Sequence, residues 1–119
     1  MQENYQKLEV WKKSMDLVEQ VYLLTKKLPR EEMFALSDQL RRAVVSIPSN
    51  IAEGQARGTK EFIHFLKVAR GSRAETETQL LICERLGYLT KTDIESAMSL
   101  LEEISKMTSS LMKNLMTKI

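Results

Sequence analysis

The sequence predicts an all-α protein, an antiparallel up-down-up-down bundle of four long helices. Apolar residues recur every three or four positions in four long segments, and no segment alternates between apolar and polar residues as a half-buried strand does. The 119 residues include only 4 Gly and 2 Pro, too few for the turns of a β-sandwich or barrel. Short breaks between the segments favour neighbouring helices of opposite direction, and the length suits one domain over residues 1–119.

The first helix is predicted over about Leu8 to Leu28, where two adjacent apolar stripes follow helical spacing. Pro29 ends it, because the residue before a proline is driven out of the α region. The second helix is predicted from about Glu31 to Gly54 or Arg57. Its early glutamates suit the positive N-terminal end of a helix dipole.

Pro48 falls inside the second helix and is expected to kink it there. Because proline has no N–H, it cannot donate to the carbonyl of Val44. A proline inside a helix lowers stability by about 3 kcal/mol unless the fold compensates. Three polar neighbours, Ser46, Ser49 and Asn50, have side chains that can bond freed backbone groups. Repair of the kink is therefore one role for these residues, and contact with a ligand is the alternative.

The third and fourth helices are bounded by capping signals. Thr59 is the predicted N-cap of the third helix, and Gly87 suits the left-handed position just after its end. Thr92 is the predicted N-cap of the fourth helix, with Glu95 three residues on to complete a capping box.

The first and fourth helices carry apolar faces wider than a four-helix core needs. One interpretation is generous packing inside the bundle. The other, which we favour, is a homo-oligomer interface on the outer side of these two helices.

Signatures of catalysis are absent from the sequence. It contains no P-loop, Rossmann glycine fingerprint, HExxH or GxSxG motif. The single histidine, His64, has no nucleophile beside it and is expected at a surface or interface, and the single cysteine, Cys83, lies among apolar positions of the third helix. We therefore expect no enzyme activity, no cofactor and no metal site.

The chain is expected to be cytoplasmic and without a membrane partner. One cysteine excludes an intrachain disulfide and suits a reducing compartment. The longest run without a charge spans Ala43 to Ala52 and contains a proline, whereas a membrane-spanning helix needs about 20 apolar residues. The first ten residues lack the apolar centre of a signal peptide.

The small net charge of +2 hides an uneven distribution of charge. Residues 41–73 carry seven basic and two acidic side chains, and residues 74–103 carry two basic and seven acidic ones. Residues 104–119 carry three lysines and no acid. The placement of charge is therefore more informative than its total.

A basic stripe is predicted on the third helix, where Lys60, Lys67 and Arg70 follow helical spacing. Arg57 lies just before this stripe, and Arg73 extends it one turn beyond Arg70. Such a stripe suits a phosphate backbone, because each contact releases condensed counterions. The alternative is a solvated face that pairs with the acidic block. No aromatic residue is interleaved, so structured nucleic acid is favoured over base stacking on single strands. The candidate nucleic-acid-binding residues are Arg41, Arg42, Arg57, Lys60, Lys67, Arg70 and Arg73.

Two segments carry a family likeness, QLRRAVVSIPSNIAEGQAR over Gln39 to Arg57 and ARGSRAETETQL over Ala69 to Leu80. They resemble the family of four-helix-bundle proteins encoded in intervening sequences of bacterial 23S ribosomal RNA genes, and the likeness covers nearly the whole chain. Arg73-Ala74-Glu75 departs from the pattern, since a hydrophobic residue is expected there. The matching motif residues are Arg41, Arg42, Ser46, Pro48, Asn50, Glu53, Gly54, Arg57, Arg70, Gly71 and Ser72.

The resemblance implies a pentameric ring of bundles, similar to the accessory protein of the reverse transcriptase in diversity-generating retroelements. It also implies a basic surface that binds nucleic acid. Among the motif residues, Gly71 is expected to let another helix approach closely, since a mid-helix glycine otherwise costs stability. Arg42 and Glu53 are expected to share a face of the second helix, with their partners left open.

The function expected is that of a non-catalytic homo-oligomer that associates with nucleic acid through a basic surface, with RNA favoured over DNA. The alternative is an accessory scaffold that docks a partner enzyme, such as a reverse transcriptase, through its charged blocks.

Overall fold

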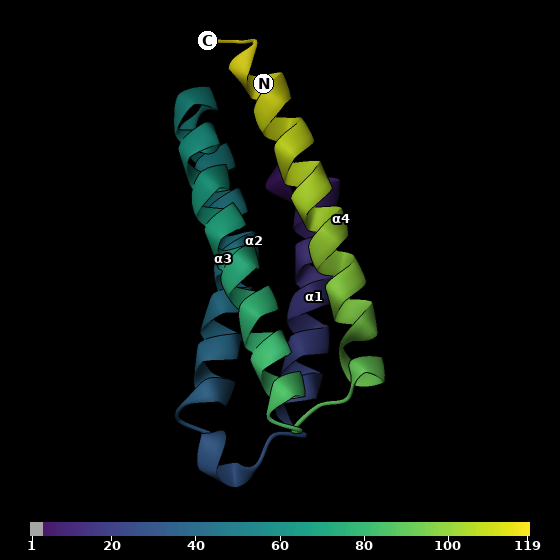
Figure 1. The fold of residues 1–119 in the computed structure, drawn as a ribbon. Coiled ribbons are helices and arrows are strands. Elements are labelled where there is room, and N and C mark those ends of the chain that lie inside the picture. Colours follow the sequence, from purple (N-terminus) through teal and green to yellow (C-terminus); the bar gives the residue numbers. More distant parts are fainter. Residues whose placement is uncertain (1–3) are drawn as a thin grey trace.

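The computed structural model describes residues 4–119, which contain four α-helices, two short 3₁₀ helices and no strand. The four long helices lie side by side along one axis (Figure 1), in a body of 46 × 23 × 20 Å. The predicted all-α four-helix bundle is confirmed. The elements are η1 (Tyr5–Lys7), α1 (Glu9–Thr25), η2 (Arg30–Glu32), α2 (Leu36–Arg57), α3 (Thr59–Arg85) and α4 (Lys91–Met116).

Helices α2 and α3 form a tight helical hairpin with a single residue, Gly58, between them. Gly58 has a φ of 123°, a conformation that residues with a Cβ rarely adopt. It is also the N-cap of α3, so the expectation that Thr59 is the cap was wrong; Thr59 is the first helical residue. The alternating direction of all four helices and the kink at Pro48 stay predictions.

The core takes fully buried side chains from all four helices. Leu17, Ile51, Leu66 and Leu101 have no exposed surface. Burial of each such side chain contributes about 1.5–3 kcal/mol of transfer free energy. Cys83 also lies in this core, where burial raises the pKa of its thiol to about 11. The thiol is therefore uncharged at neutral pH and acts as a small apolar side chain.

The connection between α1 and α2 is longer than predicted, because Glu31 and Glu32 belong to η2 and not to α2. The carboxylate of Glu32 explains the difference. It accepts hydrogen bonds from the backbone N–H of Leu36 at 3.3 Å and from the hydroxyl of Tyr88 at 2.9 Å. Glu32 thus caps α2 from outside the helix and ties this connection to the one between α3 and α4, and its hydrogen bond raises the pKa of Tyr88.

The capping box of α4 lies two residues earlier than predicted, at Thr90 and Asp93 in place of Thr92 and Glu95. The hydroxyl of Thr90 accepts from the N–H of Asp93 at 3.0 Å, and the Asp93 carboxylate accepts from the N–H of Thr90 at 2.9 Å. Lys27, in the turn that follows α1, also binds this carboxylate at 2.9 Å. The predicted left-handed position at Gly87 is confirmed by its φ of 80°.

Acid is expected to remove the stabilising effect of Asp93. The hydrogen bond from the Thr90 backbone and the one from Lys27 lower the pKa of this carboxyl from 3.8 to about 2. The stabilisation is therefore complete above pH 4 and is lost as the pH falls through 2. The unfolding temperature of Asp93→Asn should lie furthest below that of the wild type above pH 4, and this difference in unfolding temperature should become smaller towards pH 2. A gap that does not change with pH would contradict this assignment.

No helix within residues 4–119 combines the length and the apolar character needed to cross a lipid bilayer.

Candidate nucleic-acid interface

The half of α3 nearest Gly58 presents the basic stripe, which we define as Lys60, Lys67 and Arg70. All three side chains are exposed. None of them makes an ion pair within the described part of the chain, where seven other ion pairs are formed. The structure therefore places three uncompensated cations on one helix surface.

Arg57 lies beside the stripe, at the end of α2, but its charge is balanced. Its guanidinium donates to Glu53 at 2.7 Å and stacks over the ring of Phe65 at 5.2 Å. These contacts fix the orientation of the side chain. Arg57 therefore borders the basic stripe as a positioned guanidinium with half of its surface exposed.

Arg73 does not continue the basic stripe, contrary to the expectation from its spacing. It follows Lys67 by six residues, which turns it by about 120° around the helix. Its side chain is 18% exposed, lines a groove towards α4 and donates to Glu77 at 3.1 Å. The buried Nε of Arg73 has no hydrogen-bond partner within residues 4–119.

Arg41 and Arg42 also lie apart from the basic stripe, near the other end of α2. Arg42 is fifteen residues from Arg57, about 22 Å along the helix. Arg41 donates to the carbonyl of Met33 at 3.2 Å, and Arg42 pairs with Asp38 at 3.1 Å. The shared face of Arg42 and Glu53 is thus occupied by two separate local ion pairs.

Ser46, Asn50 and Ser72 form a hydrogen-bond network that joins α2 to α3. The amide of Asn50 donates to the carbonyl and the hydroxyl of Ser46 at 2.7 and 2.8 Å. The hydroxyl of Ser72 donates to that of Ser46 at 2.8 Å. The carbonyl that loses its helical hydrogen bond at Pro48 is that of Val44. The network bonds the carbonyl of Ser46 instead, so it does not replace the lost hydrogen bond. We interpret these motif residues as a polar link between the helices.

Gly54, and not Gly71, is the glycine at which two helices approach closely within this chain. A Cβ on Gly54 would lie 2.6 Å from the Cβ of Phe65 and 3.2 Å from the backbone of Phe62. A Cβ on Gly71 would meet nothing within 4 Å. The expectation that Gly71 admits a neighbouring helix was therefore wrong for the helices of this chain.

The comparisons with known proteins agree with this fold. A model of the 23S rRNA-intervening sequence protein family matches residues 6–110. The chain belongs to this family. A crystal structure of a protein with unknown function from the S23 ribosomal protein family of Bacteroides thetaiotaomicron is similar, with 34% sequence identity and a TM-score of 0.79. The match covers 87% of this chain and 98% of that one. No curated protein matches the sequence.

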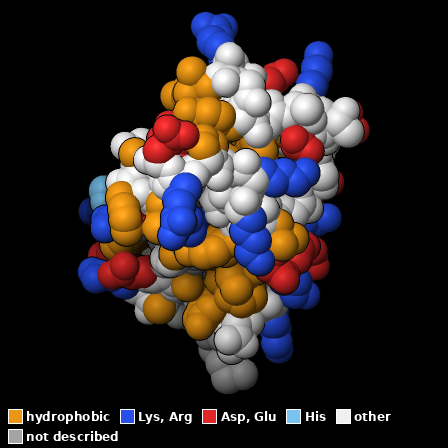
Figure 2. Space-filling view, turned by 90° about the horizontal axis from the view of Figure 1, so that it is seen from below, with side chains coloured by type: hydrophobic (Ala, Val, Ile, Leu, Met, Phe, Trp, Pro, Cys, Tyr) orange, Lys and Arg blue, Asp and Glu red, His pale blue; other side chains and the backbone are white. Residues whose placement is uncertain are grey.

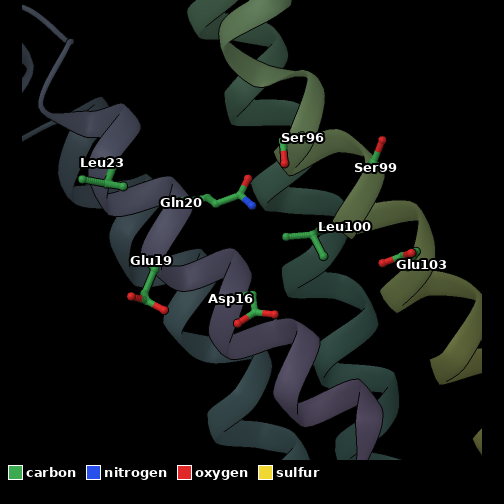
Figure 3. A pocket seen from close by; sticks show the side chains of 8 residues that line it. All are labelled: Asp16, Glu19, Gln20, Leu23, Ser96, Ser99, Leu100 and Glu103. Atoms are coloured by element: carbon green, nitrogen blue, oxygen red, sulfur yellow. The ribbon is translucent and has the colours of Figure 1, made fainter.

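This member of the 23S rRNA-intervening sequence protein family has a second surface of opposite charge, a groove between α1 and α4. Figure 3 shows Asp16 and Glu19 on α1, and Glu103 across the groove on α4. Lys13 neutralises part of this charge through an ion pair with Glu103 at 3.4 Å. The acidic groove, defined by Asp16, Glu19 and Glu103, lies away from the basic stripe on α3.

Exposed apolar side chains are found on α1 but hardly on the middle of α4. Met15, Tyr22 and Leu23 are 40–61% exposed. On α4, most of the wide apolar face packs against the core of the bundle. Its partly buried residues are Met98, Leu100, Met107 and Leu111. Figure 2 shows further apolar side chains at the end of the bundle that carries the α1–α2 connection, where Phe34 is 90% exposed.

The structure offers no cluster for metal binding within residues 4–119, where no group of three or more His, Cys, Asp or Glu side chains is close enough to hold an ion. His64 is exposed on α3, and its ring makes a T-shaped contact with that of Phe65, with 5.4 Å between the centroids.

The excess of lysine in residues 104–119 indicates a second basic surface, on α4. Lys113 of α4 shares a groove with Arg70 of α3. The sequence did not link these residues, because the link depends on how α3 packs against α4.

Proposed function

We propose that this family member is a non-catalytic, cytoplasmic protein, an up-down-up-down bundle kinked at Pro48, that binds structured RNA or RNA/DNA through its basic stripe. One observation carries the proposal. Lys60, Lys67 and Arg70 are exposed without carboxylate partners in the described residues, whereas Arg42, Arg57 and Arg73 have them. Cations without local partners are the ones that gain most from phosphate contacts.

Backbone contacts, and not base reading, suit this surface. The stripe offers point charges and a guanidinium on a regular helix, which fit phosphate oxygens. No aromatic side chain lies within it, so there is no platform for stacked bases. Because the family is named for an intervening sequence of 23S rRNA, a fragment of structured rRNA is the first ligand to test.

Self-association is part of the proposal. Met15, Tyr22 and Leu23 leave an apolar surface on α1 that a second copy can cover. In a closed pentameric ring, the basic stripe is repeated around the axis, which strengthens the positive field that nucleic acid meets.

Binding to a structured rRNA fragment is expected to weaken steeply with salt. Three phosphate contacts give a fall in log K of about 2–3 per decade of salt concentration, and more if several subunits contact one RNA. Fluorescence anisotropy over a range of salt concentrations measures this slope. An absence of binding at low salt would contradict the proposal.

The acidic groove favours a second candidate function, a scaffold that docks a basic partner protein such as a reverse transcriptase. Asp16, Glu19 and Glu103 offer a negative surface on the side of the bundle formed by α1 and α4 (Figure 3). Capture of a purified partner should then survive nuclease treatment and be lost in the double variant Asp16→Asn, Glu19→Gln. Capture that nuclease abolishes would count against this function.

A further inference from the structure

The groove between α3 and α4 near the C-terminal end of α4 combines cations and hydroxyls from both helices. It is lined by Arg70, Ser109, Ser110, Met112, Lys113 and Met116. We propose that this groove is a phosphate subsite, in which Arg70 and Lys113 bind one phosphodiester group and the hydroxyls of Ser109 and Ser110 donate to its oxygens. The inference rests on the proposed function, and it extends the nucleic-acid surface from α3 onto α4.

The charge of the groove supports an anionic ligand. Arg70 and Lys113 approach it from two helices, and neither makes an ion pair in the part of the chain that the structure describes. Two uncompensated cations on one groove repel each other, and an anion between them relieves the repulsion. The two side chains also differ usefully, because a guanidinium binds phosphate oxygens in a fixed fork and an ammonium binds as a point charge.

The two serines have hydroxyls that are free for a ligand. Two hydroxyls of α3 are already used within the helix, because Thr76 donates to the carbonyl of Ser72 and Thr78 to that of Ala74. Ser109 and Ser110 are exposed and make no such bond among residues 4–119. Their hydroxyls can therefore donate to phosphate oxygens without breaking an existing hydrogen bond.

The sign of the charge changes along the valley between α3 and α4, which limits where a phosphate can bind. Nearer the α3–α4 connection, the lining includes four glutamates against Arg73 and Lys91: Glu77, Glu84, Glu95 and Glu102. That stretch repels an anion. The groove at Lys113 is instead continuous with the basic stripe, because Arg70 belongs to both.

A matched pair of lysine variants on α4 tests the subsite. Lys113→Gln is expected to weaken binding to a structured rRNA fragment about 5- to 8-fold at 0.1 M salt and to reduce the salt slope by about 0.7–0.9. Lys106→Gln removes the same charge from the same helix, but Lys106 is bound to Glu102 at 3.4 Å and lines a different groove with α1. Its effect on affinity should be no more than about 2-fold. Equal losses for the two variants would overturn the subsite, because only the overall field would then matter.

Inorganic phosphate separates failure of the subsite from failure of the proposed function. Met112 and Met116 line the groove and Met98 lines the acidic stretch, so the methyl groups of these methionines serve as probes. Phosphate is expected to shift the NMR signals of the first two, but not of Met98, and the shifts should disappear in Lys113→Gln. Shifts without RNA binding would reject the nucleic-acid function and retain the anion site. RNA binding that Lys113→Gln leaves unchanged would retain the function and reject the subsite. In that case Lys113 only offsets the negative end of the α4 dipole. Lys113→Gln should then lower the unfolding temperature and leave the affinity for RNA unchanged.

Discussion

Replacement of Lys60, Lys67 and Arg70 by glutamine is expected to weaken RNA binding about 100- to 500-fold at 0.1 M salt. Each lost phosphate contact reduces the slope of log K against log salt concentration by about 0.7–0.9, so the triple variant should reduce this slope by about 2–3. All three side chains are exposed and make no ion pair within residues 4–119, so the fold should be retained. Anisotropy titrations at several salt concentrations give the affinity, and circular dichroism gives the unfolding temperature.

A control with the same change in net charge distinguishes local contact from the field of the whole protein. Lys12, Lys13 and Lys106 are three lysines that pair with glutamates on α1 and α4. Their replacement by glutamine also removes three positive charges, but away from the stripe. If this control binds RNA as weakly as the stripe variant, the basic stripe is not the contact surface. If both bind as the wild type does, the proposed function fails.

Arg73 shows why the site was less predictable from the sequence than the fold. Spacing along the chain gave the helix and its basic composition, but it also suggested that Arg73 extends the stripe. Whether a long side chain faces solvent or folds over its own helix depends on the neighbouring helix, here α4, and on a local acceptor, here Glu77. Lys113 was missed for the same reason, because only the packing of α3 against α4 brings it to Arg70.

Helix number and core faces were predictable, because periodic burial is encoded locally. Helix starts were less predictable, because several residues can serve as caps. Thr90 and Thr92 are both plausible N-caps, and the choice depends on which acidic side chain stands three residues on and on the backbone after Gly87. The sequence pattern predicts Glu32 at the start of a helix, although its hydrogen bonds to Leu36 and Tyr88 hold it in the connection between α1 and α2. No sequence pattern revealed those tertiary partners.

Gly54→Ala is expected to lower the free energy of unfolding by about 2 kcal/mol. The new Cβ would lie 2.6 Å from the Cβ of Phe65 and 3.2 Å from the Cα of Phe62, so the backbones of α2 and α3 must separate. Overpacking of this kind costs up to about 3 kcal/mol, and the helix propensity of alanine returns about 1 kcal/mol. Denaturant unfolding measures the difference, which corresponds to a lower unfolding temperature by several degrees.

Gly71→Ala is the matched control, since it makes the same chemical change in the middle of a helix with open space around the new Cβ. It should raise the free energy of unfolding by about 0.5–1 kcal/mol. Because helix propensity cancels between the two variants, their difference measures how closely α2 and α3 pack at Gly54. Equal effects would contradict the close approach. A loss of stability in Gly71→Ala that grows with protein concentration would instead show that a second copy covers α3 at Gly71, since only an assembled protein would then meet the added methyl group.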